Sequence, residues 1–285
     1  MSIGERPKPV EGLSLPIHDI YHIAESDWST LCQFFRVSGD EGVPAVVTFG
    51  THFRDKTPTN PLETLAIAPL DIPSEKRLEI EDLIAGHDSA SYHPGAIKLK
   101  DTSGWYEQSI HAIFFNRTNL SRIEEFASVM SEEVTHSLVS VPEPFVTFSL
   151  SRFDSLENLP KSFHRQVAQA AHDAEGPNYS RVDLNEFFPP LALAFQNRLR
   201  GDLLRRHKNL GVHIPQSYEE KVSQIFNIHK LIRYLPEYAA DLLLRQYGNN
   251  AEAILQEYPD LPSWSGEEIW AKICLPILTT GKLSN

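Results

Sequence analysis

The segment from Ser109 to Phe153, SIHAIFFNRTNLSRIEEFASVMSEEVTHSLVSVPEPFVTFSLSRF, constrains the fold more than any other stretch of this chain. In residues 110–115, apolar side chains occupy both of the alternating positions of an extended strand, which predicts a buried strand. Ser121 and Glu124 have the spacing of a capping box, and apolar residues then recur at helical spacing. A second β-rich run follows a Pro-Glu-Pro break. The segment therefore predicts strand, helix, strand.

The parts on either side of residue 155 differ in character. Before it, runs rich in β-branched residues such as 43–53 alternate with helical patterns, whereas after Pro160 apolar residues recur almost wholly at helical spacing. We therefore expect an α+β protein with a mixed or antiparallel sheet in its first part and an all-helical second part, with strands confined to residues 40–155. The expected parts are a flexible leader at 1–15, an α+β part at 16–155 built around the β-α-β segment 109–153, and a helical part at 156–285 packed on it.

Composition places the chain among globular proteins of the cell interior. With 285 residues, 41% hydrophobic and 22% charged, it can bury a sizeable core. No apolar run approaches the roughly 18 residues that span a membrane, and the N-terminus lacks the apolar region of a secretory signal. Only Cys32 and Cys274 are present, far apart and in no metal-binding spacing, which is typical of reduced thiols. We expect a soluble, cytoplasmic protein.

The net charge of −12 is carried by the first part of the chain. Residues 1–160 hold 12 basic and 24 acidic side chains, whereas residues 161–285 hold 14 of each. An acidic surface repels the phosphates of nucleic acids and anionic lipids, so neither is an expected partner for the first part. The plainer explanation is that the acidic side chains keep the protein soluble.

The chain is histidine-rich, with 12 histidines, and the closest approach to a metal-binding motif is His18-Asp19-Ile20-Tyr21-His22. On a helix, His18 and His22 lie one turn apart on one face and can hold one divalent metal, with a third ligand from Glu25 or a remote histidine. On a strand they lie about 13 Å apart, at ~3.3 Å per residue, which is too far for one ion. Unbound histidines near the surface are the alternative interpretation.

Candidate acid/base residues are His93 and His52, because each lies in a loop or at a strand end beside predicted β-structure. His93 belongs to the polar loop 86–95, which combines acid, base and nucleophile types between a predicted helix and a predicted strand. The chain contains no nucleophile-elbow, dinucleotide-binding or phosphate-loop motif. A serine triad or a nucleotide site therefore has no motif support.

The one basic cluster contains Arg198, Arg205 and Arg206 on a predicted helix. Arg205 and Arg206 are the candidate residues for binding an anionic ligand such as a phosphate or carboxylate. The alternative is a solvated helix end, where cations offset the negative end of the helix dipole.

Two functions of different class follow from these observations. The first is an enzyme acting on a small molecule in a cleft between the two parts, by histidine acid/base chemistry or with a divalent metal held partly by His18 and His22. The second is a non-catalytic regulatory or interaction protein whose acidic first part and amphipathic helices bind a protein partner or a second copy of the chain. The absence of common catalytic motifs favours the second, and the histidines and the polar loop favour the first.

Overall fold

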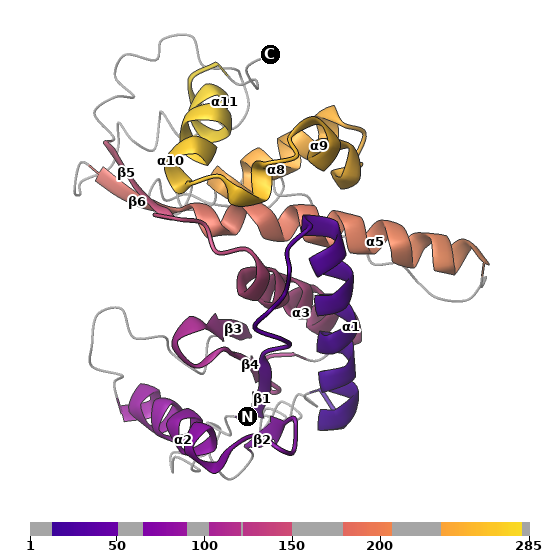
Figure 1. The fold of residues 1–285 in the computed structure, drawn as a ribbon, viewed down its shortest axis with the longest axis vertical. Coiled ribbons are helices and arrows are strands. Elements are labelled where there is room, and N and C mark those ends of the chain that lie inside the picture. Colours follow the sequence, from indigo (N-terminus) through magenta and orange to yellow (C-terminus); the bar gives the residue numbers. More distant parts are fainter. Residues whose placement is uncertain are drawn as a thin grey trace, which may run out of the picture. The chain divides into compact units, whose positions relative to one another are not determined.

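The computed structural model describes residues 13–50, 65–89, 103–120, 122–149, 179–206 and 235–280. The chain forms two compact units (Figure 1). The first unit comprises Met1–Gln33 and Val37–Ser137, and the second comprises Phe34–Arg36 and Leu138–Asn285. The predicted boundary at residue 155 stays a prediction, because residues 150–178 lie outside the described ranges.

The first unit is built on a four-stranded mixed sheet with strand order β2-β1-β4-β3. The central strands β1 and β4 are parallel to each other, and each pairs antiparallel with an edge strand. The elements, in chain order, are α1 (Ile17–Phe35), β1 (Ala45–Phe49), β2 (Ala66–Ala68), α2 (Ser74–Ser89), β3 (Gly104–Glu107), η3 (Gln108–Ile110), β4 (Ala112–Asn116) and α3 (Ile123–Leu138).

All five residues of β1 and all five of β4 are buried, as expected for strands that read AVVTF and AIFFN. On one face Phe114 stacks on Trp105 of β3, with ring centroids 4.5 Å apart, in a cluster with Ile80 and Ile84 of α2. On β4, Phe115 contacts Phe126 of α3, with centroids 5.2 Å apart. The predicted buried strand at 110–115 and the helix after it are confirmed, while the capping role of Ser121 falls outside the described residues.

Helix α1 is continuous from Ile17 to Phe35, although Ser26 and Asp27 are residue types that often cap the start of a helix. Ser26 instead lies inside the helix, where its carbonyl accepts a hydrogen bond from the Thr30 hydroxyl at 2.8 Å. Ile20, Ala24 and Leu31 are fully buried, so one apolar stripe runs the length of the helix and explains why it does not break. His18 and His22 are therefore helical.

The second unit combines helices with a two-stranded antiparallel sheet, β5–β6. Pro189 and Pro190 lie in the first turn of α5, where a missing N–H costs nothing. Phe34 stacks on Phe195 of α5 with centroids 4.3 Å apart. The elements are β5 (Phe145–Ser149), β6 (Tyr179–Asp183), η5 (Leu184–Phe187), α5 (Phe188–Arg206), α8 (Leu235–Gln246), α9 (Ala251–Glu257), η6 (Leu261–Ser263), α10 (Gly266–Ile269), η7 (Trp270–Cys274, a π-helical turn) and α11 (Leu275–Thr280).

The α+β class, with a mixed sheet in the first part, is confirmed, but the second part is not all-helical. Strand β6 lies beyond Pro160 and pairs with β5, with Val146 opposite Val182. The sequence YSRVD hides this strand, because a two-stranded sheet needs few apolar side chains. Since β5 belongs to this second sheet, the segment 109–153 contains strand, helix and strand in order but not a β-α-β unit of one sheet.

Within the described ranges no helix is both long enough and apolar enough to cross a membrane.

Candidate functional site

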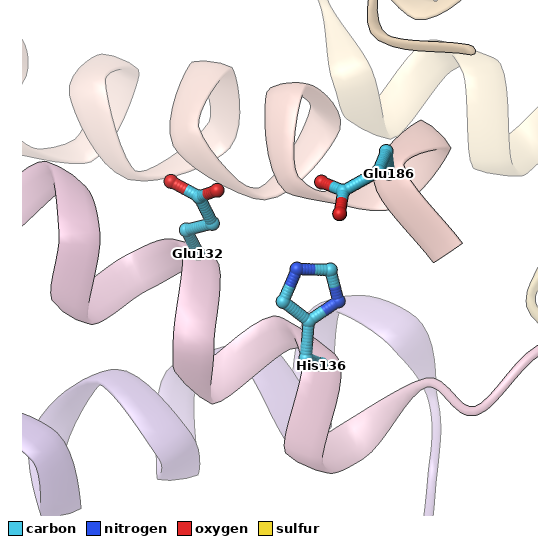
Figure 2. A group of neighbouring side chains, drawn as sticks. All are labelled: Glu132, His136 and Glu186. Atoms are coloured by element: carbon cyan, nitrogen blue, oxygen red, sulfur yellow. The ribbon is translucent and has the colours of Figure 1, made fainter. Parts of the chain in front are cut away.

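Helix α3 of the first unit carries Glu132 and His136, one turn apart on the same side of the helix (Figure 2). Both side chains are half-buried, and a carboxylate oxygen of Glu132 and a ring nitrogen of His136 lie within 4.8 Å of each other. Buried apolar side chains hold the helix in place, among them Phe126, Met130 and Val134. Glu186, which Figure 2 also labels, is a half-buried residue of η5 in the second unit.

A carboxylate and an imidazole at this spacing are suited to one divalent cation. Both groups are ligands of Zn²⁺ and similar ions, with ligand atoms near 2.0–2.2 Å from the metal. Residues four apart on a helix face the same way, so small side-chain rotations bring Glu132 and His136 to a common point. Partial burial lowers the competition from bulk water and strengthens the attraction between a cation and the carboxylate. The arrangement can hold a metal and leave coordination positions open.

A second cluster in the first unit surrounds His111, which has a left-handed backbone (φ 46°) between η3 and β4. Its Nε2 lies 2.9 Å from the carbonyl oxygen of Gly42, and its Nδ1 lies 2.8 Å from the hydroxyl of Tyr106. A carbonyl only accepts, so Nε2 carries a hydrogen and Nδ1 of the neutral ring accepts from the phenol. A carboxylate oxygen of Glu41 lies 3.4 Å from Nδ1.

The His111 cluster ties the turn before β1 to the β3–β4 hairpin. Burial, assisted by the negative charges of Glu41 and Glu107, raises the pKa of Tyr106 to about 12, so its phenol remains a hydrogen-bond donor near neutral pH. Both nitrogens of His111 are engaged, which leaves neither of them directed at a substrate. We assign this cluster a structural role.

The predicted metal pair, His18 and His22, has the helical spacing that metal binding requires, because α1 is a helix there. His22 is exposed and lies beside Glu25, with Nδ1 3.2 Å from a carboxylate oxygen. Within the described part of the chain, neither histidine belongs to a group of three side chains whose ligand atoms converge. Metal binding at His18 and His22 stays a prediction.

The other predicted site residues are placed as follows. His52 and His93 lie outside the described residues, so their acid/base role stays a prediction. Of the polar loop predicted at 86–95, residues 86–89 belong to α2, which continues to Ser89, and the rest lies outside the described residues. Arg205 and Arg206 lie in the last turn of α5, and anion binding by them stays a prediction. Arg198, from the same basic cluster, forms an ion pair with Glu252 of α9.

Sequence reasoning missed both Glu132 and His136, although they lie in the segment taken as central. The signal was present in SEEVTHSL, where a carboxylate and an imidazole are four residues apart on a predicted helix. Such a pair is common on solvated helices, and only its half-burial distinguishes this one. For His111 no local signal exists, because its carbonyl partner is 69 residues away in sequence.

A comparison of the chain with protein-family models, with curated proteins and with solved structures finds no match.

Proposed function

We propose that the protein is an intracellular enzyme that acts on a small molecule with the help of a divalent metal held by Glu132 and His136. The observation that carries the proposal is the half-buried carboxylate–imidazole pair on α3, with ligand atoms within 4.8 Å of each other. A divalent metal in such a site supplies Lewis-acid polarisation or an activated water. Glu132 and His136 bind and orient it, and the acid/base role predicted for His93 and His52 belongs to the same hypothesis.

Metal binding is tested by thermal unfolding of chelator-treated protein titrated with Zn²⁺ or Mn²⁺. The metal binds the folded state, so at 100 times the dissociation constant it stabilises the protein by about 2.7 kcal/mol and raises the melting temperature. Glu132→Gln and His136→Gln each remove one ligand of similar size and should abolish most of this rise. Isothermal titration calorimetry on the same proteins gives the stoichiometry, which should be one ion per chain.

The matched control uses the other helical pair of the first unit. His18→Gln and His22→Gln remove two side chains with the same spacing on α1, and the metal response should survive both changes. If the metal-induced rise in melting temperature were lost in these variants and kept in Glu132→Gln, the metal would bind at α1 and not at α3. A melting temperature indifferent to metal and chelator in the unmutated protein would overturn the proposal.

The second candidate function, a non-catalytic interaction protein, is favoured by exposed apolar side chains on the first unit. Leu70, after β2, is 77% exposed, and Leu78, on α2, is 59% exposed. Exposed apolar side chains are common sites of protein contact when they form a contiguous patch. The replacement of both by Asp should then abolish self-association or partner capture measured by light scattering and pull-down, and leave the metal response unchanged.

A further inference from the structure

Three aromatic side chains of the second unit form a connected cluster where α8, α9 and the turn before α10 meet. The rings of Tyr247 and Tyr258 have centroids 6.5 Å apart at 72°, and those of Tyr258 and Trp264 are 5.9 Å apart at 74°. All three side chains are half-buried, so each ring presents part of its surface to solvent. Rings that meet nearly at right angles form a corner, in contrast to the flat stack of Trp105 on Phe114 in the first unit.

A cation of the chain itself lies over one ring of this cluster. The ammonium of Lys272 lies over the indole of Trp264, 4.1 Å from the ring centroid, within the range of a cation–π interaction. It also donates a hydrogen bond to a carboxylate oxygen of Glu268 at 2.9 Å. The ammonium of Lys272 therefore contacts a carboxylate and an indole face at the same time.

Hydrogen bonds hold the carboxylate that pairs with Lys272 at the start of α10. Glu268 forms a capping box with Ser265, in which its carboxylate accepts from the Ser265 backbone N–H at 3.0 Å. The hydrogen bond from Lys272, and after it that from the Ser265 backbone, lower the pKa of Glu268. Lys272 itself is 49% exposed at its side chain and ends on a flexible four-carbon stem. The side chain of Glu268 is 45% exposed, so both partners of the ion pair are open to solvent and an external cation can compete with the Lys272 ammonium for the indole face.

Three acidic residues lie close in sequence to the residues of the corner, and the cation Arg245, two residues before Tyr247, is paired with Asp241. Glu257 precedes Tyr258, Asp260 follows it, and Glu267 lies beside Glu268, all three with exposed side chains. Acidic side chains around aromatic faces favour cationic ligands and disfavour anions. Burial, and after it the hydrogen bond with Tyr258, raise the pKa of Tyr247 to about 12, so its ring stays a neutral phenol.

We propose that the corner formed by Tyr247, Tyr258 and Trp264 is a binding site for an organic ammonium group, for which Lys272 is the internal competitor. The ligand is a methylated or free alkylammonium, carried either by a small molecule or by a lysine side chain of another protein. A quaternary ammonium should bind most tightly, because the free-energy cost of removing it from water to an aromatic face is small. The site is independent of the metal pair on α3.

The proposal is tested by titration of the full chain with choline, observed through the indole ¹H–¹⁵N signals of the four tryptophans. Binding should shift the signal of Trp264, which Trp264→Leu identifies by its loss. Dimethylbutanol, which replaces the charged nitrogen of choline with carbon, is the matched neutral ligand and should cause no shift at equal concentration. An equal response to both ligands would overturn the proposal, because it would show apolar contact only.

Substitution of Lys272, the internal competitor, tests the ammonium site most directly. Lys272→Gln removes the internal cation and keeps side-chain length, and it should tighten choline binding about two- to five-fold, the factor expected from the strength of an exposed cation–π contact. Trp264→Leu keeps apolar bulk and should abolish binding, and Trp264→Phe, with a weaker π face, should retain part of it. Unchanged affinity in Lys272→Gln would overturn the role of Lys272 as competitor. Binding retained in Trp264→Leu, observed through the shifts of neighbouring amides, would overturn the site.

A final titration with peptides distinguishes the two sources of the ligand. A peptide with one trimethyllysine and the same peptide with unmodified lysine are compared with choline on the unmutated protein. Tighter binding of the trimethyllysine peptide than of choline assigns the site to a protein partner, and equal affinity assigns it to a small quaternary ammonium. The absence of binding by all three probes, in the unmutated protein and in Lys272→Gln, would reject an ammonium site.

Discussion

Strands β4 and β5 have the same length and a similar composition, AIFFN and FVTFS, yet their surroundings differ. Every residue of β4 is buried, because β1 and β3 pair with its two edges, Ile80 and Ile84 of α2 belong to the core cluster of Phe114, and Phe126 of α3 contacts Phe115. Strand β5 has the single partner β6, and its Phe145 is 49% exposed. The comparison shows that aromatic and β-branched residues predict where a strand forms, whereas the packing of its side chains by the rest of the fold decides how much that strand contributes to stability.

The largest expected effect comes from Phe114→Ala in β4. Phe114 is fully buried and stacks on Trp105, so its truncation removes apolar contacts and leaves a cavity. We expect a loss of about 3–5 kcal/mol in the free energy of unfolding, measured by urea denaturation. A loss below about 1 kcal/mol would mean that the core of the first unit rearranges around the missing ring.

A smaller loss of stability is expected from Gly266→Ala, because the backbone of Gly266 contacts the segment that leads into β5. The N–H of Gly266 donates to the carbonyl of Pro142 at 2.9 Å, and a Cβ at this position would lie 2.4 Å from the carbonyl oxygen of Glu143. Gly266→Ala should therefore cost about 1–3 kcal/mol in urea denaturation. Glu267→Ala, at an exposed neighbouring position, is the control and should stay within about 0.5 kcal/mol.

The third prediction concerns Tyr106, whose strand β3 supports one side of β4. Tyr106→Phe removes the hydrogen bond to His111 and should cost about 1 kcal/mol near neutral pH. The pKa of Tyr106 is raised by folding to about 12, so its contribution is complete below pH 10.0 and is lost as pH rises toward about 12. The difference between the two proteins, measured by urea denaturation from about pH 9 upward, should shrink over that range. A difference independent of pH would contradict this.

The smallest effect is expected from Phe145→Ala in β5. Its ring is 49% exposed, so truncation removes little buried surface, and the expected cost is below about 1 kcal/mol. If Phe145→Ala lowered the free energy of unfolding as much as Phe114→Ala in parallel urea denaturation, the comparison would be wrong. Strand β5 of the two-stranded sheet would then contribute as much to stability as the central strand β4.

Much of the first unit could be predicted from the sequence because its strands are continuous apolar runs. β1 and β4 were recognised in this way, and α3 was recognised from the helical spacing of its apolar residues. Strand β6 was not, because Ser180, Arg181 and Asp183 mask its pattern and its partner lies beyond a long intervening stretch. The helical interpretation of His18 and His22 was left open for a local reason, since Pro16 and a short apolar run do not reveal that α1 continues to Phe35.

The functional residues were harder to predict than the strands. The pair Glu132 and His136 has a visible spacing, but half-burial is a property of the packed helix and not of its sequence. The aromatic corner joins Tyr247, Tyr258 and Trp264 through the turns after α8 and α9, so no single periodicity contains it. Lys272 reaches the indole from a π-helical turn, which no residue pattern in the chain indicates.

The parallel pairing of β1 with β4 determines the order in which the first unit can assemble. The β3–β4 hairpin closes through the three residues of η3, a local event that takes about 1–10 μs in small hairpins. β1 joins only when the chain between Ala45 and Ala112 has been closed into a loop, which costs entropy before any contact between the two strands forms. We therefore expect the hairpin to act as a template, and β3 and β4 to acquire protection in pulsed hydrogen exchange before β1 and its edge partner β2.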